Sequence, residues 1–515
     1  MKNIKYIVLS IGMAFGITAC QDAYEIDPVG LVDEEAAFYT LNEAQTVLDG
    51  TYSQMNNMNQ IAFTAIFTDE LAPSVQWNGS NRDVHQMILN STSGFPAAIW
   101  LDGHAGVNRA NRILNGLAEF EPADGAEETR LNDMRAQARF IRAYSYLTLL
   151  SYFSPNMEDN DALGAILFED VATYGTPVKP RATNGEIYQL MEEDLNFAVE
   201  HLKGDNFIYP TKAAAEAIMA RMYAYRGMYQ QAAVYANHVI NNYGLSLTVA
   251  TPFTHNSAFY STASPTPYKQ MWLDYIRDTS NPNGNVTIPA SQLEQILTLR
   301  SQPGEGTPSF QVAAIFFQNG TACSGSPLWS MSYRLHEMYS SNPNDVRLYA
   351  FVDPTTWSGA GCNGGEVMID KYPGIGSANP LVNNLKLIRL SEMYMILAEA
   401  AASNGDLTGA ANYIYQVEVA RSTTGSATMP SFSSTTDAWA GILEERRKEF
   451  FAEGYRYVDL KRLGAKANVS IDRDQRDNEN PGEPLTIPID DHRFTLPIPF
   501  NEISVNPDIV QNPGY

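Results

Sequence analysis

A repeated spacing between small residues and glycine constrains the fold of this chain more than any other feature. Ala220 is followed after seven residues by Gly227, and Ala398 is followed by Gly405 at the same distance. Both stretches carry apolar residues at helical spacing. A small residue lets two helices approach closely, and a glycine can adopt the left-handed conformation that ends a helix. We therefore predict a helical hairpin at each position.

The two hairpins resemble tetratricopeptide repeats, in which successive helix pairs stack on one another. Such units need neighbours to bury their apolar faces. Apolar periodicity predicts further helices in the ranges 33–55, 99–120, 127–153 and 186–202, in addition to 212–242 and 387–421. We expect a mainly α-helical fold in which these helices form further hairpins and stack as tetratricopeptide-like pairs.

Residues 245–384 differ from the rest because they are rich in Ser, Thr, Asn, Pro and Gly and contain only short apolar pieces. We predict loops with short helices and little strand there, without a separate core. Loops held by a rigid scaffold often carry function. We expect one unit over 20–515, in which 20–244 and 385–464 are mainly helical, 245–384 faces the ligand, and 465–515 is a C-terminal extension.

The first residues predict export. Lys2 and Lys5 precede an apolar run over 6–17, which is too short to span a bilayer. The sequence ITAC that ends at Cys20 resembles a bacterial lipobox, which implies a signal peptide over 1–19 and lipid on the Cys20 sulfur. More than one acyl chain gives stable anchoring in a membrane. The alternative is an ordinary secretory leader with a chance cysteine.

The net charge and the two remaining cysteines restrict which ligands and metal sites we expect. The chain has 34 basic and 58 acidic residues, a formal charge of −24, so it lacks the basic footprint of a nucleic-acid-binding protein. A neutral or cationic ligand fits this balance better than a polyanion. Cys323 and Cys362 could form a disulfide in an exported protein, or remain two free thiols in loops. They fall short of the four ligands of a structural zinc site.

The stretch from Glu444 to Gly464 combines dense charge with aromatic residues. We predict a helix ended by Gly454 and a second short helix ended by Gly464. Its carboxylates could be acid/base groups or structural ion-pair partners; they are Glu449, Glu453 and Asp459. The arginines at helical spacing from them are Arg446, Arg456 and Arg462. Nearby guanidinium groups favour the ionised carboxylate, so a general acid is disfavoured and we predict structural ion pairs.

Several segments together resemble the SusD/RagB family of outer-membrane nutrient-binding lipoproteins. They occur in the family's order and are ARFIRAY (138–144), RAT…EIYQLMEEDLNFAVEHL (181–202), IRLSEMYMILAEA (388–400), ERRKEFFAEGYRYVDLKRLG (445–464) and LPIPFNEISVNPDIVQNPGY (496–515). The resemblance implies four tetratricopeptide-like helix pairs supporting a loop-rich half. It also implies that the protein binds oligosaccharide, or peptide in the RagB branch, and caps a SusC-like TonB-dependent transporter.

Aromatic residues in polar loops are the best candidates for ligand contacts, because sugar rings stack their C–H faces on indole or phenol rings. Trp77 is the first candidate, since it lies in the polar sequence VQWNGSNRD. The alternative is a loop tryptophan that only fills a gap in the scaffold. The full set of predicted ligand-binding residues is Trp77, Asn78, Arg82, Trp329, Trp357 and Tyr260.

Other site types find little support in the sequence. Asp472, Asp474 and Asp477 resemble part of a calcium loop, but Asp477 occupies the position of the glycine, so we favour a charged solvated loop over structural calcium. The chain has no HExxH, GxSxG or P-loop motif, and we predict no enzyme and no cofactor. We expect a surface lipoprotein that binds glycan as a transporter lid. The alternatives are a peptide-binding lid, a surface glycoside hydrolase and a plain tetratricopeptide scaffold.

Overall fold

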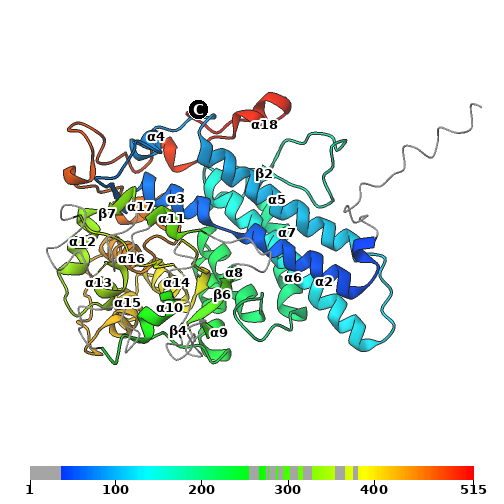
Figure 1. Cartoon of the computed structure of the whole chain (residues 1–515), viewed down its shortest axis with the longest axis horizontal. Helices are drawn as coiled ribbons and strands as arrows, with labels where there is room; N and C mark the ends of the chain where they lie inside the picture. Colours follow the sequence, from blue (N-terminus) through cyan, green and yellow to red (C-terminus); the bar gives the residue numbers. More distant parts are fainter. Residues whose placement is uncertain are drawn as a thin grey trace, which may run out of the picture.

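The computed structural model describes residues 36–253, 266–273, 276–277, 286–287, 294–301, 311–316, 327–353, 366–374 and 381–515. Most elements in these ranges are helices (Figure 1). The α-helices are α2 (Leu41–Thr51), α3 (Met58–Phe67), α4 (Arg82–His85), α5 (Gly94–Gly116), α6 (Gly125–Phe153), α7 (Asn184–His201), α8 (Lys212–Tyr225), α9 (Tyr229–Asn242), α10 (Pro267–Leu273), α11 (Ala313–Phe316), α12 (Tyr333–Ser340), α13 (Val346–Phe351), α14 (Leu390–Ser403), α15 (Leu407–Arg421), α16 (Thr435–Glu449), α17 (Arg456–Ala467) and α18 (Phe500–Val505). The 3-10 helices are η1 (Ala36–Phe38), η2 (Tyr52–Met55), η4 (Gln475–Asp477) and η5 (His492–Phe494).

Both hairpins predicted from the glycine spacing form as α8–α9 and α14–α15. Gly227 and Gly405 have φ of +71° and +75°. The residue after each glycine donates its N–H back into the preceding helix, from Met228 to the Tyr223 carbonyl and from Asp406 to the Ala401 carbonyl, both at 2.9 Å. These are Schellman ends, which satisfy the last carbonyls of a helix. The glycine is required because other residues rarely adopt this conformation.

The helices stack in a continuous array. α5 packs against α6, α6 against α7, α7 against α8, and α9 against α14, although about 150 residues separate α9 from α14 in the sequence. In Figure 1, α2, α5, α6 and α7 lie side by side on the right, whereas the short helices α10, α12 and α13 lie on the left beside α16. The predicted mainly helical, tetratricopeptide-like fold is confirmed. No helix in the described ranges is long and apolar enough to cross a membrane.

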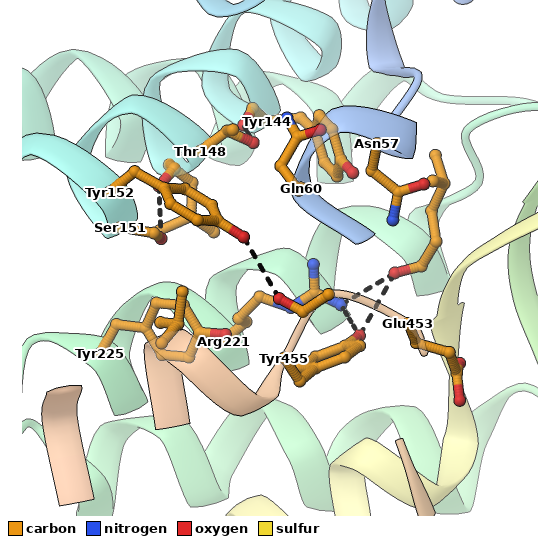
Figure 2. A pocket seen from close by; sticks show the side chains of 14 residues that line it. Asn57, Gln60, Tyr144, Thr148, Ser151, Tyr152, Arg221, Tyr225, Glu453 and Tyr455 are labelled. Atoms are coloured by element: carbon orange, nitrogen blue, oxygen red, sulfur yellow. Dashed lines mark hydrogen bonds between the residues drawn. The ribbon is translucent and has the colours of Figure 1, made fainter. Parts of the chain in front are cut away.

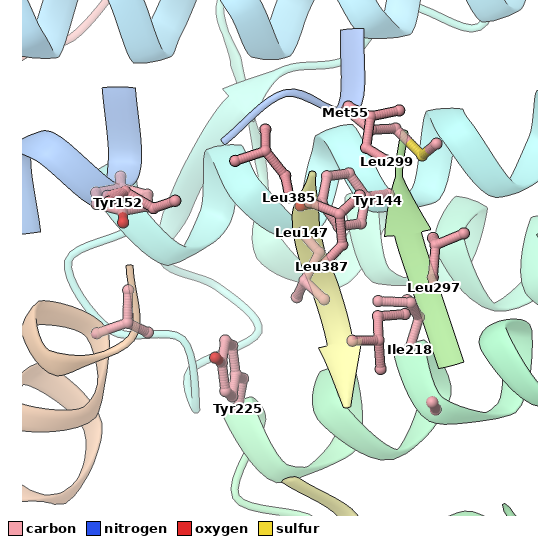
Figure 3. Close-up of a cluster of buried hydrophobic side chains, with 14 of the residues drawn as sticks. Met55, Tyr144, Leu147, Tyr152, Ile218, Tyr225, Leu297, Leu299, Leu385 and Leu387 are labelled. Atoms are coloured by element: carbon pink, nitrogen blue, oxygen red, sulfur yellow. The ribbon is translucent and has the colours of Figure 1, made fainter. Parts of the chain in front are cut away.

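The strands are short and pair antiparallel, two by two, within the described ranges. The pairs are β1 (Leu71–Pro73) with β7 (Trp329–Met331), β2 (Leu163–Ile166) with β3 (Arg181–Thr183), β4 (Ile276–Arg277) with β5 (Val286–Thr287), and β6 (Gln295–Leu299) with β8 (Leu385–Arg389). Figure 3 shows the leucines of β6 and β8 among Met55, Tyr144 and Ile218, which come from the helical half. This pair therefore fixes the base of the loop-rich region to the helical core.

Three local predictions are corrected. The polar sequence over 72–96 predicts an exposed loop, but this range contains the end of β1 and all of α4, and His85 and Met87 are buried. Gly464 does not end a helix: α17 continues to Ala467, and Asn468 caps it with φ of +53°. A side chain at Gly464 would place its Cβ 2.8 Å from a backbone oxygen, that of Val469, so close approach explains this glycine. Gly454, with φ of +88°, lies in the turn between α16 and α17, after α16 has ended at Glu449.

Candidate functional site

The three candidate carboxylates of the 444–464 stretch, Glu449, Glu453 and Asp459, are buried and ion-paired. Glu449 contacts three guanidinium groups, those of Arg389 and Arg421 at 2.7 Å and that of Arg347 at 3.2 Å. Burial alone would raise the pKa of Glu449, but Arg421 and Arg389 hold it well below the usual range. An ionised, enclosed carboxylate of this kind cannot act as a general acid at neutral pH.

Glu453 and Asp459 are paired in the same way. Glu453 bonds to Lys371 and Arg389, each at 2.7 Å. Asp459 bonds to Arg446 and Arg462, each at 2.8 Å. Burial opposes ionisation of Asp459, yet the two guanidinium groups lower its pKa. The prediction of structural ion pairs is confirmed for these carboxylates.

The predicted partners were right only for Asp459. Glu449 pairs with arginines from α13, α15 and β8 rather than with Arg446, and Arg456 bonds to Asp69 at 2.8 Å rather than to Glu453. Helical spacing identifies partners on one helix face, whereas these partners come from distant segments that fold against α16 and α17. We call the set of Glu294, Arg347, Arg389, Arg421, Glu449 and Glu453 the core ion network.

A small polar cavity lies beside this network (Figure 2). Its volume is about 60 Å³, and Arg221 and Tyr455 form one wall, where Arg221 donates to the Tyr455 hydroxyl at 2.7 Å. Within the described ranges, the side-chain oxygens of Asn57 and Gln60 have no hydrogen-bond partner. Unpaired buried polar atoms around a space of this size suit one or a few water molecules. The cavity is too small for a sugar ring, so we do not assign it to a ligand.

The loop that carries Trp77 follows β1 directly and is fixed at its start. Ser74 donates its N–H to the Leu328 carbonyl at 3.1 Å and its hydroxyl to the Pro327 carbonyl. Gly79 and Asn81 adopt φ of +86° and +56°, which lets the loop turn back into α4. The loop is therefore a defined platform on the surface. We refer to residues 74–82 as the Trp77 loop.

The Trp77 indole is half-buried and held in place from two sides. Its Nε1–H donates to the Ser80 carbonyl at 2.9 Å, and its ring packs against Trp329 with centroids 5.8 Å apart. The Arg82 guanidinium lies over the Trp77 ring, 5.1 Å from its centroid. The ring is therefore pre-oriented, and its outer surface is covered by a side chain that is itself half exposed.

Trp329 does not match its prediction as a ligand contact. It is only 2% exposed, because β7 pairs with β1 and its ring packs between Trp77 and His85. A buried indole cannot stack on a ligand from solvent. Trp329 instead supports Trp77 from below, a role that local sequence could not show because β1 and β7 are more than 250 residues apart.

The polar residues of the Trp77 loop lie at the surface. Asn78 is exposed, and its Oδ1 accepts from the Ser80 N–H at 3.0 Å. Arg82 bonds to Glu479 at 3.0 Å, and the neighbouring Gln86 donates to Glu483 at 2.9 Å. The C-terminal extension thus places the carboxylate of Glu479 against the Arg82 side chain that lies over the indole. Sequence reasoning missed Glu479 and Glu483, because only the fold brings them to α4.

Several predicted residues lie outside the described residues, and their predictions stand untested. They are Cys20, Tyr260, Cys323, Trp357 and Cys362. Glu366, at the boundary of the undescribed range 354–365 that contains Trp357, accepts from the backbone N–H of Val75 in the Trp77 loop. Burial raises the pKa of Glu366. One described flank of the Trp357 segment therefore touches the Trp77 loop.

The aspartates compared with a calcium loop have other roles. Asp474 caps η4, and its side chain accepts from Arg476 at 2.7 Å. Asp477 is fully buried, contrary to the solvated loop we predicted, and accepts from the Tyr333 N–H at 2.8 Å. Asp472 is paired with Arg334 at 3.2 Å. Among the described residues, no group of three or more His, Cys, Asp or Glu side chains is arranged to hold a metal ion.

Comparison with known proteins agrees with this architecture. The model of the SusD family matches residues 329–515, and a family described as starch-binding associating with outer membrane matches residues 32–224. The chain belongs to the SusD/RagB family. The two matches cover opposite ends of this SusD/RagB chain, including the Trp77 loop and both α16 and α17.

Individual SusD/RagB relatives are distant but align over nearly their whole length. SusD-like protein P2 from Formosa agariphila is 24% identical and aligns with 99% of this chain and 100% of its own. A putative sugar-binding protein from Bacteroides vulgatus has a structure with a TM-score of 0.71, 23% identity, and coverage of 92% and 99% of the two chains. A SusD-like carbohydrate-binding protein from the same species has a TM-score of 0.68, 17% identity, and coverage of 91% and 97%. At these identities the structural likeness establishes the fold.

Proposed function

We propose that this protein binds oligosaccharide or polysaccharide at the Trp77 loop. The observation that carries the proposal is the fixed, half-exposed indole with an amide and a guanidinium beside it. An indole face attracts the C–H face of a sugar ring, and amide and guanidinium groups bond to hydroxyls in pairs. Two of the related structures are described as sugar- or carbohydrate-binding proteins, which supports the same ligand class.

The Arg82 side chain covers the indole, so it must move before a sugar ring can stack there. Its ion pair with Glu479 is at the surface, with side-chain exposures of 50% and 38%, and such pairs contribute little to stability. A sugar ring can therefore take the place of Arg82 over the indole at low cost. The displaced guanidinium then remains close enough to donate to the sugar hydroxyls. No covalent step is involved.

The cellular setting forms the second part of the proposal. Lipid on Cys20 anchors the protein to the outer membrane, and the bound glycan passes to a SusC-like TonB-dependent transporter for which the protein acts as a lid. The family description that links starch binding with the outer membrane supports this setting. Replacing Cys20 with Ala should release the protein from membranes; membrane association that persists without a transporter would contradict the anchor.

Calorimetry against a panel of neutral polysaccharides tests the ligand class. We expect at least one glycan to bind, and Trp77→Ala to weaken it about tenfold or more, because stacking on the indole is lost. Tyr174→Ala is the matched control, since it removes a fully exposed aromatic ring outside the loop. Binding of mixed peptides but of no glycan would contradict the proposal, and release of reducing sugar would indicate a hydrolase.

A further inference from the structure

A groove on the helical half of the molecule gathers positive charge in a protein whose net charge is −24. It has a volume of about 360 Å³ and lies between α5, α6 and α7. Arg135, Arg139 and Arg142 project into it from successive turns of α6. We call it the arginine groove.

Two of the three arginines, Arg139 and Arg142, share the carboxylate of Asp194. Both carboxylate oxygens of Asp194 accept from Arg142, whose Nε and Nη2 each lie 2.7 Å from a different oxygen. Arg139 reaches the same carboxylate through a single contact of 3.3 Å. Three guanidinium charges against one carboxylate leave the groove lining with an excess of two positive charges. The carboxylates of Glu169 and Glu193 act on this cluster from outside the groove.

Two of the guanidinium groups keep donors free for a ligand. Within the described ranges, the hydrogen bonds of Arg135 run to the backbone carbonyls of Leu117 and Ala118. The Nε of Arg139 is buried without a hydrogen-bond partner there. A buried donor without a partner costs free energy unless a ligand or water satisfies it. Burial and the adjacent Arg139 also lower the pKa of Arg135, as expected where a counter-charge is missing.

The rest of the groove suits a sugar ring. The Phe197 ring lies beneath the Arg139 guanidinium, 4.5 Å from its centroid. Leu114 and Ala118 supply an apolar wall, and Asn132 supplies an amide at the rim. The volume falls in the usual range of small-molecule sites, about 300–1,000 Å³. A protein partner would instead need a surface of about 800 Å² per side, so the groove favours a small charged group.

We propose that the arginine groove is a second glycan subsite, which binds a sugar unit carrying a carboxylate or a sulfate ester. Guanidinium groups recognise both oxyanions through paired hydrogen bonds. The inference rests on the proposed glycan-binding function and adds acidic glycans to the ligands that we expect. The groove lies near the C-terminal end of α5, roughly 30 Å by helix rise from the end that follows α4 and the Trp77 loop, so it acts independently of Trp77.

Calorimetry with the full chain tests the proposal on four probes: an oligogalacturonate, a sulfated oligosaccharide, a neutral malto-oligosaccharide of equal length, and sodium sulfate. We expect at least one acidic oligosaccharide to bind more tightly than the neutral one, and to weaken as NaCl rises to about 0.5 M. Arg135→Gln should weaken acidic binding about 3- to 10-fold, and the double change with Arg139→Gln about 10- to 100-fold.

Controls separate the groove from general charge, folding and the first site. Arg109→Gln removes one positive charge from the exposed face of α5 outside the groove and should leave affinity unchanged. Arg139→Lys keeps the charge but loses the planar fork, so its affinity should lie between those of the native protein and Arg139→Gln. Trp77→Ala should not affect acidic binding at the groove.

Three results would overturn the inference. One is equal affinity of the double variant for the acidic oligosaccharides. Another is sodium sulfate binding as tightly as they do, which would indicate a site for free anions. The third is loss of transporter association, rather than of oligosaccharide binding, in the double variant, which would indicate a protein contact. If neutral glycans still require Trp77 in any of these cases, the proposed function stands and only the groove assignment fails.

Discussion

Arginine has different roles in the core ion network and in the arginine groove. In the network, Arg389 and Arg421 are almost fully buried and each contacts both Glu449 and Glu294. In the groove, Arg135 and Arg139 are half-buried; Arg139 has one 3.3 Å contact with Asp194, and Arg135 bonds to backbone carbonyls. A buried arginine whose charge is fully paired indicates a structural role. An arginine with unpaired N–H donors beside a cavity indicates ligand recognition. Exposure and unsatisfied donors therefore separate the two roles better than the density of charge along the sequence.

Removing the central carboxylate of the network should give the largest effect on stability. Glu449→Gln removes a negative charge that compensates the buried guanidinium groups of Arg389, Arg421 and Arg347. We expect a loss of about 3–5 kcal/mol in the free energy of unfolding, or failure to fold. Urea denaturation measures the loss. Glu444→Gln, on the exposed face of the same helix, should change stability by about 0.5 kcal/mol or less.

Asp69 and Glu70 allow a sharper test, because adjacent buried carboxyls are shifted in opposite directions. Burial would raise the pKa of Asp69, but Arg447 and Arg456 outweigh it and hold the pKa well below the usual range. Its ionised form therefore stabilises the fold above about pH 4, and this contribution is lost as pH falls through the folded pKa. Asp69→Asn should cost about 3 kcal/mol near neutral pH.

Glu70 should behave in the reverse manner. Burial, with Asp69 beside it, raises the pKa of Glu70 to about 8, and its Oε2 has no hydrogen-bond partner within the described ranges. The folded state keeps a proton that an unfolded glutamate loses near pH 4, so stability declines as pH rises from about 4 to about 8. Glu70→Gln should flatten this decline and stabilise the protein by about 1–3 kcal/mol near pH 9. Unfolding curves across pH measure both variants; parallel profiles would contradict the assignment.

The sequence allowed prediction of what local spacing determines. The hairpins at Gly227 and Gly405 follow from glycine conformation and helical periodicity. One ion partner of Asp459 is also local, since Arg462 lies one turn away on α17.

The remaining features depend on contacts between distant segments. The partners of Glu449 come from residues 28 to 102 positions away, and no periodicity in the sequence links them. Trp329 is buried because β7 pairs with β1, and the charge excess of the arginine groove arises because Asp194 on α7 contacts Arg142 and Arg139, whereas Arg135 bonds to backbone carbonyls. The net charge of −24 favoured neutral or cationic ligands, but an average over the chain does not reveal a local excess of positive charge.

A change in the turn that joins α16 to α17 should have an effect of intermediate size on the free energy of unfolding. It tests backbone conformation separately from the charges of the network. Gly454 has φ of +88°, so Gly454→Ala places a side chain in the left-handed region and should cost about 1–2 kcal/mol. Gly50 lies within α2 with open space at its Cβ position, and Gly50→Ala should instead stabilise by about 0.5–1 kcal/mol. Thermal unfolding compares the two. Equal effects would contradict the role given to the Gly454 turn.

The smallest effect on stability should come from Arg82, and this makes it the decisive counterpart of the network arginines. Its ion pair with Glu479 is solvated, so Arg82→Gln should change the free energy of unfolding by about 0.5 kcal/mol or less. The same change removes a donor beside the Trp77 indole and should weaken neutral glycan binding severalfold in calorimetry. A loss of more than about 2 kcal/mol, with affinity unchanged, would place Arg82 with the structural arginines. Arg82 would then serve folding rather than ligand binding. The distinction between buried, paired arginines and exposed, available ones would then not hold at the proposed glycan site.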